Sequence, residues 1–162
     1  MGFILLCAVL LFSCEKSSEM TEVAVMPVYQ DDMEIVRIAE DARNTLPVFF
    51  RYLTGAGNAG KDCYVKYPFL ADEDSGIDKE QIWLTDIQFN SGRYFGVLAN
   101  APRHLSGMNR GDRVIFDVEA ITDWMYIQGG KIIGGESVKY LLEKIPEDQR
   151  NDRERELLRM LL

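Results

Sequence analysis

The chain has 162 residues, of which 26 are acidic and 18 basic, and its formal net charge is −8. This acidic balance disfavours nucleic acid as a partner, because basic side chains supply most of the affinity for phosphates. Its length and its apolar content of 47% fit one domain with a buried core. Three cysteines and one histidine favour neither a disulfide framework nor a zinc cluster, so we expect no metal and no cofactor.

An uncharged apolar run opens the chain, from Gly2 to Ser13. As a helix it would be too short for the roughly 30 Å hydrocarbon core, and its length is typical of the apolar region of a signal peptide. Residues 11–14, LFSC, resemble the lipobox of bacterial lipoproteins, in which the cysteine is acylated and becomes the new N-terminus. We therefore expect a lipoprotein signal peptide over residues 1–13 and lipidation at Cys14. The alternative is an ordinary secretory signal with a chance cysteine.

This resemblance implies a protein anchored by its N-terminal lipid to a membrane of the cell envelope. Glu15 follows the cysteine, whereas an Asp there would resemble an inner-membrane retention signal. The outer membrane is therefore favoured where the cell has one. Residues 14–32 begin polar and small and contain Pro27, which predicts a flexible tether. The alternative for this stretch is an edge strand, where a proline is tolerated.

A helix is predicted after the tether. Asp31 and Asp32 precede Met33, and Glu34 follows at the spacing of a capping box. Apolar residues then recur at spacings of three and four, and they are Ile35, Ala39, Ala42, Leu46, Phe49 and Leu53. Pro47 lacks an amide and crowds the preceding turn, so the helix should kink or restart near Leu46. The glycines of TGAGNAGKD end it, and the spacing of a phosphate-binding loop is absent there.

From Cys63 onward the apolar residues alternate instead. Five short segments rich in β-branched and aromatic residues are predicted as strands, and they read CYVKYPFL, QIWLTDIQF, RYFGVLA, RVIFDVEAI and DWMYIQ. Turns are predicted at Asn90-Ser91-Gly92 and at Gly129-Gly130. Because no helix-length segment separates these strands, the sheet should be antiparallel.

The C-terminal part reads as helical. ESVKYLLEKI predicts a short helix that ends at Pro146, and the charged residues 146–162 predict a loosely held terminal helix. The fold class is therefore α+β. We expect a curled antiparallel sheet of about five strands, a proline-kinked N-terminal helix on one face, and a short C-terminal helix.

Six segments of the chain resemble one known family in their order and spacing, and they are ARNTLPVF, VKYPF, EQIWLTDI, FGVLANAP, MNRGDRVIF and ITDWMYIQGGKIIGG. They are similar to the YegJ-like family, domain of unknown function 2314 (DUF2314). The resemblance covers about residues 33–145, which we take as the domain. The chain has Gln81 where the family has a histidine, and Ser137 and Lys139 where it usually has Thr and Arg. The family name implies no activity.

The two tryptophans mark one candidate site. Trp83 and Trp124 each lie on a predicted strand, and an indole serves either as a core anchor or as the wall of a ligand site. Asp123 precedes Trp124, where it either satisfies nearby backbone amides or lies at a pocket rim. The first hypothesis is a non-catalytic binding module that recognises an unknown protein or small ligand through Trp83, Asp123 and Trp124.

The second hypothesis is a small hydrolase. Asp112 and Asp123 would form an acid–base pair, and His104, the only imidazole, would assist them. Each has a simpler explanation, because Asp112 follows a glycine at a strand entrance and His104 lies in a loop. The chain offers few residues that could act as a base at neutral pH, so the sequence favours the binding module over an enzyme.

Overall fold

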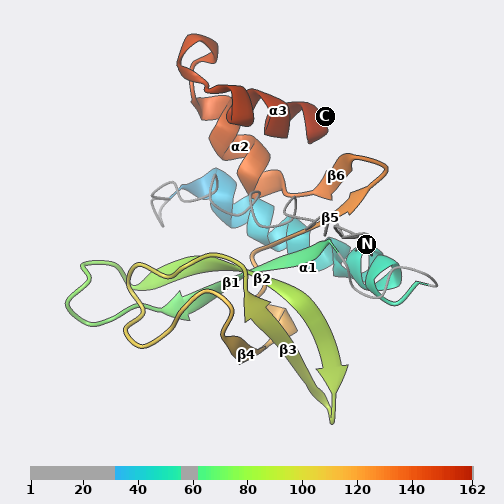
Figure 1. Cartoon of the computed structure of the whole chain (residues 1–162), viewed down its shortest axis with the longest axis vertical. Coiled ribbons are helices and arrows are strands. Elements are labelled where there is room, and N and C mark those ends of the chain that lie inside the picture. Colours follow the sequence, from blue (N-terminus) through green and yellow to red (C-terminus); the bar gives the residue numbers. More distant parts are fainter. Residues whose placement is uncertain (1–31, 56–61, 162) are drawn as a thin grey trace, which may run out of the picture.

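The computed structural model describes residues 32–55 and 62–161 and confirms the α+β class. The predicted signal peptide, the lipidation site and the tether except Asp32 lie outside the described residues, as does most of TGAGNAGKD. One antiparallel sheet has the strand order β4-β3-β2-β1-β5-β6 (Figure 1). Its strands are β1 (Cys63–Leu70), β2 (Lys79–Asn90), β3 (Arg93–Leu98), β4 (Arg113–Phe116), β5 (Asp123–Gln128) and β6 (Lys131–Gly134). The helices are α1 (Met33–Leu53), α2 (Glu136–Lys144) and α3 (Asp152–Met160), with short 3₁₀ turns η2 (Val118–Ala120) and η3 (Glu147–Gln149).

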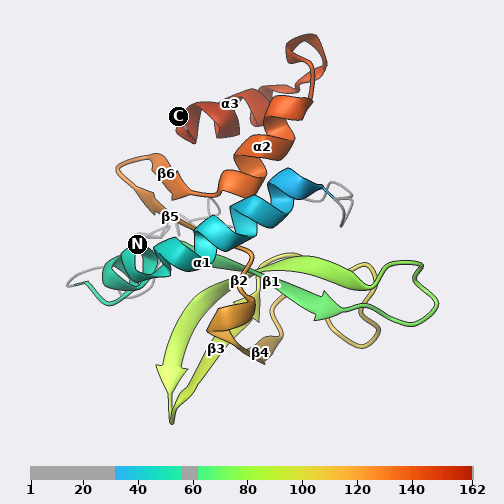
Figure 2. The ribbon, with the colours of Figure 1, turned by 180° about the vertical axis from the view of Figure 1, so that it is seen from behind.

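Helices cover both faces of the central strands. Successive side chains of a strand point to opposite faces, so each central strand contributes to a core on either side. One apolar cluster joins α1 to the sheet through residues such as Phe49, Val65 and Trp124. The other joins α2 and α3 to the opposite face through residues such as Tyr64 and Trp83. Figure 2 shows α1 crossing the sheet and the α2–α3 pair lying beyond it. The protein therefore has two hydrophobic cores that share one sheet.

Helix α1 begins at the predicted cap. The Asp32 carboxylate accepts a hydrogen bond from the Glu34 amide over 3.1 Å. The helix runs through Pro47 without a break, so of the two expected effects of this proline the restart near Leu46 is excluded. Pro47 lies on the exposed side, while Leu46 and Phe49 are buried against the sheet. The packing of these two side chains holds the helix together across the missing amide.

The sheet has one strand more than the five that were predicted. The extra strand is β6, from the segment that follows the Gly129-Gly130 turn. Both glycines have positive φ, 58° and 76°, as a tight two-residue hairpin requires. The predicted segment RVIFDVEAI is a strand only over Arg113–Phe116, because Asp117 caps the 3₁₀ turn η2.

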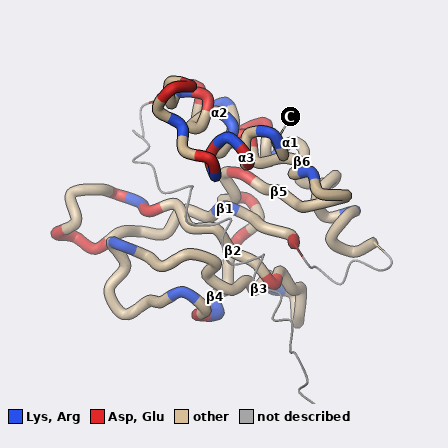
Figure 3. Tube along the Cα trace, turned by 45° about the horizontal axis from the view of Figure 1, so that its top comes forward, with Lys and Arg blue, Asp and Glu red and all other residues tan. Residues whose placement is uncertain are grey.

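The charged C-terminal segment is a helix, as predicted, but it is held firmly. Asn151 and Glu154 form a capping box at the start of α3, and Leu157 is buried in the second core. Charged residues are dense on α2 and α3, whereas the strands are mostly uncharged (Figure 3). Among residues 32–55 and 62–161, no helix is both long and apolar enough to cross a membrane.

Candidate functional site

A β-bulge in β2 shapes an exposed apolar part of the molecule. The pairing of β2 with β3 shifts register between Thr85 and Gln88, and Asp86 adopts a left-handed φ of 50°. Before the bulge, Leu84 faces α1. After it, Ile87 and not Asp86 takes the α1 side, since an extra residue reverses the alternation of a strand. The bulge therefore turns an apolar set of side chains toward the helix.

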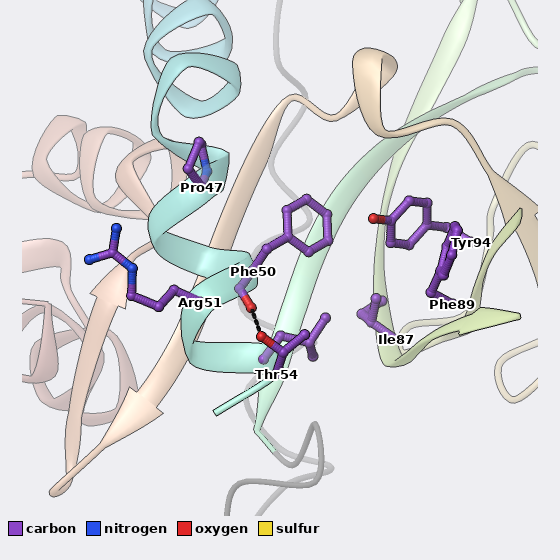
Figure 4. A pocket seen from close by; sticks show the side chains of 8 residues that line it. Pro47, Phe50, Arg51, Thr54, Ile87, Phe89 and Tyr94 are labelled. Atoms are coloured by element: carbon purple, nitrogen blue, oxygen red, sulfur yellow. Dashed lines mark hydrogen bonds between the residues drawn. The ribbon is translucent and has the colours of Figure 1, made fainter. Parts of the chain in front are cut away.

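These side chains form one wall of a surface pocket of about 570 Å³. The pocket lies between the C-terminal half of α1 and the β2–β3 hairpin, and we call it the helix–hairpin pocket. Its lining residues are Pro47, Phe50, Arg51, Leu53, Thr54, Ile87, Phe89 and Tyr94. Figure 4 shows Phe50 on the helix facing Tyr94 on the sheet, with Phe89 beside Tyr94. The volume and the aromatic lining are typical of small-ligand or side-chain binding sites.

Aromatic contacts fix the shape of this pocket. The Tyr94 ring lies 4.7 Å from that of Phe89 and 5.3 Å from that of Phe50, between ring centroids. Phe89 nevertheless keeps 63% of its surface exposed. Thr54 donates its hydroxyl to the Phe50 carbonyl over 2.8 Å and so closes the last turn of α1 (Figure 4). The pocket thus presents an aromatic wall that no described residue covers.

A second pocket also includes Tyr94 and lies at the β3–β4 edge of the sheet, and we call it the edge pocket. Its volume is about 500 Å³. Its lining residues are Tyr67, Gly92, Arg93, Tyr94, Ile115, Phe116, Asp117 and Val118. Phe116 lies 5.8 Å from Tyr94, and Ile115 is 53% exposed. The two pockets therefore share one tyrosine and together extend from α1 to the sheet edge.

Each pocket includes one arginine. Arg51 lines the helix–hairpin pocket and Arg93 lines the edge pocket. Both side chains are exposed, and neither has a hydrogen bond or ion pair with another described residue. By contrast, Arg37 pairs with both Glu34 and Asp41. Arg51 is thus available to an anionic group of a ligand in the helix–hairpin pocket, whereas the edge pocket includes Asp117 as well as Arg93.

The sequence-predicted tryptophans lie on opposite faces of the sheet and do not share a site. Trp124 belongs to the α1 core, where its indole donates to the Ala42 carbonyl over 3.0 Å. Trp83 belongs to the α2–α3 core and is 2% exposed. Its indole nitrogen is buried and has no hydrogen-bond partner among the described residues. A ligand role for these residues stays a prediction, and the structure places both in the core.

Asp123 lies at the centre of a buried polar network. Its carboxylate accepts from the Trp124 amide over 2.8 Å, from the Ser137 amide over 2.9 Å and from the Ser137 hydroxyl over 2.5 Å. Lys66 donates its ammonium to the same hydroxyl over 2.6 Å and lies over the Trp83 ring at 4.8 Å. Burial raises the pKa of Asp123, although Lys66 opposes the shift, and burial lowers the pKa of Lys66.

The network joins three elements. Lys66 comes from β1, Asp123 from β5, and Ser137 from the first turn of α2. A serine next to a lysine and a carboxylate resembles a nucleophile with its base. Here the three residues are 5%, 1% and 4% exposed, respectively, so a substrate has no access to the hydroxyl. The arrangement anchors the N-terminus of α2 to the sheet, which is the backbone-capping alternative considered for Asp123.

The structure does not bring the proposed hydrolase residues together. Asp112 accepts the Asn109 amide over 2.7 Å and thereby forms an exposed turn. It directly precedes β4, whereas Asp123 begins β5, and four strand spacings separate them, roughly 19 Å. His104 is half-buried, and its amide donates to the Glu80 carboxylate over 2.8 Å. In the described ranges, no group of three or more His, Cys, Asp or Glu side chains could hold a metal ion.

Sequence reasoning missed the pocket residues Phe50, Phe89 and Tyr94. A signal for them was present, since Leu84 and Ile87 are both apolar yet three positions apart in a strand with period two. This slip of the alternation indicates a bulge. Lys66 was missed as well, although a lysine between the apolar residues of a central strand indicates either an exposed face or a buried partner.

Comparisons with known proteins give one family and two relatives. A family model described as "Uncharacterized protein conserved in bacteria (DUF2314)" matches residues 32–157. A putative ankyrin repeat protein of Neisseria meningitidis serogroup B is 32% identical over 129 residues, which are 77% of this chain and 51% of that protein. The uncharacterized protein YegJ of Escherichia coli K12 is 34% identical over 80 residues, 49% of this chain and 52% of that protein. The chain thus spans about half the length of these curated relatives. No solved structure matches it.

Proposed function

The chain belongs to the DUF2314 family of bacterial proteins. From its N-terminal sequence and its surface pocket we propose that it is a lipid-anchored envelope protein whose domain is a non-catalytic binding module. The binding site is the helix–hairpin pocket. The observation that carries this function is the open aromatic wall formed by Phe50, Phe89 and Tyr94. Exposed aromatic side chains that line a hollow are typical of recognition sites, because burying them on binding releases the cost of their hydration.

The lining of the pocket supports binding over catalysis. Arg51 is the one charged side chain among the described residues that line it, and these residues include no carboxylate, imidazole or thiol. Acid–base and nucleophilic catalysis need such a group within hydrogen-bond distance of the reacting atom. The hydrolase hypothesis gains no support from the placement of Asp112, Asp123 and His104 in separate parts of the fold.

The name of one relative agrees with a recognition role. That protein is described as a putative ankyrin repeat protein, and the matched region is about half of it. Ankyrin and other repeat proteins bind partners through extended surfaces. A recognition role for the present domain would agree with that name.

A small aromatic probe tests the site. N-acetylphenylalaninamide added to protein with ¹³C-labelled isoleucine methyl groups should shift the signal of Ile87, which lines the pocket. Phe89→Ser should abolish this shift, because it removes an exposed wall of the pocket. Leu70→Ser is the matched control, since Leu70 is 79% exposed and lies outside the pocket. If Ile87 does not respond, or if Leu70→Ser weakens binding as much as Phe89→Ser, the pocket is not the site.

The anchor has its own test. Mass spectrometry of the protein from membranes should find a lipid on Cys14 as the N-terminal residue. Cys14→Ser should leave the protein uncleaved or release it from the membrane, whereas Cys7→Ser should leave anchoring unchanged because Cys7 precedes the expected cleavage site. An unmodified N-terminus at another residue would exclude lipid anchoring without affecting the pocket.

A further inference from the structure

We propose that the protein self-associates through the β4 edge of its sheet, where a second copy of the chain pairs antiparallel with the same strand. Ile115 of the two copies would lie opposite each other on the two-fold axis, and Arg113 of each copy would face Asp117 of the other. This inference goes beyond the proposed function, because it requires neither the lipid anchor nor the helix–hairpin pocket.

The β4 edge of the sheet is open. β4 is the last strand in the sheet order, so among the described residues only β3 pairs with it. The Leu98 amide donates to the Asp112 carbonyl over 2.9 Å just before β4 begins. From this pair, the alternation of an antiparallel ladder directs the backbone groups of Val114 and Phe116 toward β3. The amide and carbonyl of Ile115 therefore point away from β3, and such an unpaired edge is a template for another strand.

The backbone and the charges together select one register for this pairing. The free edge carries the backbone groups of every second residue, Arg113, Ile115 and Asp117, and Asp117 is still extended, with φ −99° and ψ 126°. Two copies can therefore pair only with these residues opposite one another. Centring the pair on Ile115 places Arg113 opposite Asp117 of the other copy twice. A shift of two residues places one of these charges opposite Ile115 instead, and opposite charges across an antiparallel pair are the stabilising arrangement.

Both charged side chains at this edge have hydrogen-bonding groups to spare. Arg113 is exposed, and it has no ion pair with a described residue. It donates Nη2 to Gln88 over 3.2 Å and lies over the Phe95 ring at 4.5 Å, which leaves further N–H donors of its guanidinium. Asp117 accepts the Glu119 amide through Oδ1 over 3.1 Å, and its Oδ2 has no hydrogen bond with a described residue. Each side chain can thus form the ion pair without losing its present contacts.

The pairing also covers exposed apolar surface. Ile115 is 53% exposed and lies opposite the half-buried Phe95. Both point away from α1, because their neighbours Tyr94 and Phe116 pack in the α1 core. In the paired copies the two Ile115 residues would be about 5.5 Å apart between Cα atoms, so the apolar stripe would continue from one copy into the other. Figures 1 and 2 show α2 and α3 at the far end of the molecule from β4, so neither helix covers this edge.

The size of the interface and the net charge make this a weak dimer. Five residues of each strand span only about 17 Å, so the contact belongs among the smallest specific interfaces. Both copies carry a formal net charge of −8, but charges farther apart than about 8 Å are largely screened at physiological salt. The two local ion pairs therefore act against a weak general repulsion. We expect a dimer that forms at high protein concentration and dissociates on dilution.

Amide hydrogen exchange of the full chain in detergent tests which backbone groups pair. When the protein concentration is raised roughly a hundredfold, exchange of the Ile115 amide should slow several-fold, because this amide gains a partner only in the dimer. The Val114 amide is the internal control, since it faces β3 in the monomer and in the dimer, and its exchange rate should not change. An Ile115 exchange rate that does not depend on concentration would overturn the proposal.

Charge reversal tests the register by sedimentation velocity. Arg113→Glu and Asp117→Arg should each abolish the rise of the sedimentation coefficient with concentration. An equimolar mixture of the two variants should restore it, because one native and one reversed ion pair then form between unlike copies. Net charge alone predicts the opposite for Asp117→Arg, which lowers the repulsion between copies. Lys131→Glu is the matched control, since Lys131 is exposed on the other edge strand, β6, and this variant should behave as the wild type does.

The outcomes that contradict the β4 pairing are distinct. If both single variants are folded by circular dichroism and their mixture sediments as each does alone, the register is wrong. Asp117→Asn keeps an acceptor for the cap of η2 and should weaken the dimer several-fold, so it decides the matter if Asp117→Arg does not fold. If Lys131→Glu or Phe89→Ser abolishes self-association and the β4 variants do not, a second copy binds at β6 or at the helix–hairpin pocket, and the proposal is overturned.

Discussion

Ile87 lies directly over Gly96. A Cβ atom added to Gly96 would come within 3.2 Å of Ile87 Cδ1 and within 3.0 Å of Leu84 Cβ, closer than ordinary van der Waals contact. The missing side chain of Gly96 therefore leaves room for the Leu84 and Ile87 side chains where the bulge of β2 lies beside β3. Since the same bulge directs Phe89 toward α1, the candidate pocket depends on a glycine that does not line it.

Gly96→Ala should destabilise the domain and weaken binding. The added methyl group must displace Leu84 or Ile87, and overpacking of a well-packed core usually costs about 1–3 kcal/mol. Urea unfolding measures this loss, and the Ile87 methyl shift with N-acetylphenylalaninamide measures the loss of the pocket. Combining Gly96→Ala with Ile87→Val removes the crowded Cδ1 and should recover part of the stability. If the effects of the two substitutions on stability are additive, contact between the added methyl group and Ile87 Cδ1 does not cause the destabilisation.

Asp86 gives an independent test of the bulge. Its φ of 50° is left-handed, which Asn and Asp tolerate better than other non-glycine residues do. Asp86→Asn should therefore change the free energy of unfolding by less than about 0.5 kcal/mol. Asp86→Val should cost about 1–2 kcal/mol, because its Cβ branch is strained in this region. Lys79→Val is the control, because it places a valine at an exposed position of the same strand. An equal loss of stability in Lys79→Val would rule out backbone strain at Asp86 as the cause.

The sequence was sufficient to predict the elements of this fold but not its site. Periodicity gave α1, the first five strands and the C-terminal helices, because each pattern reflects the burial of its own segment. The pocket depends on contacts between distant segments, such as Phe50 with Tyr94, and on a one-residue bulge in β2. Trp83 and Trp124 were conspicuous as residue types, yet the pairing of β1 with β2 and β5 places them on opposite faces. Residue type alone does not tell on which face of the sheet a side chain lies.

Cys63 should be unreactive in the folded protein. It is fully buried, and burial together with the neighbouring Asp62 raises the pKa of its thiol from 9.0 to about 11. Only the thiolate is nucleophilic, so at pH 8 Ellman's reagent should react with Cys63 much more slowly in native than in urea-unfolded protein. Cys7→Ser and Cys14→Ser leave Cys63 as the one thiol for this assay. Equal rates in the two states would contradict burial.

The same shift predicts a loss of stability in alkali. Between pH 9 and about 11 the unfolded state releases the Cys63 proton while the folded state keeps it. The unfolded state then binds fewer protons, so the free energy of unfolding should fall as pH rises through this range. Burial also raises the pKa of Tyr64 to about 12, and this residue acts in the same direction. Cys63→Ala should flatten the curve between pH 9 and 11, as measured by urea unfolding at a series of pH values.

The next prediction concerns the hydrogen bonds that link Lys66 through Ser137 to Asp123. The Ser137 hydroxyl accepts from Lys66 over 2.6 Å and donates to Asp123 over 2.5 Å. Ser137→Ala should leave both buried groups short of a partner, at a cost of about 1–3 kcal/mol. Ser137→Thr is the matched control, because it keeps the hydroxyl and should lose less. If Ser137→Ala and Ser137→Thr lose similar stability, the loss arises from packing at this position and not from the missing hydrogen bonds.

Lys66→Met should be more damaging than Ser137→Ala. Methionine fills most of the same volume, but it leaves the buried Asp123 carboxylate without a cation, and breaking a buried charge pair costs about 3–5 kcal/mol. Burial already raises the pKa of Asp123, and removal of Lys66 should raise it further. The folded state then keeps the Asp123 proton to a higher pH than the unfolded state does, so the stability of Lys66→Met should fall as pH rises above about 4.

Urea unfolding of the wild-type protein and of Lys66→Met between pH 4 and 8 measures this pH dependence, and Lys66→Met combined with Asp123→Asn should remove the added pH dependence. If the single variant loses equal stability at every pH in this range, Asp123 is not the group that Lys66 compensates.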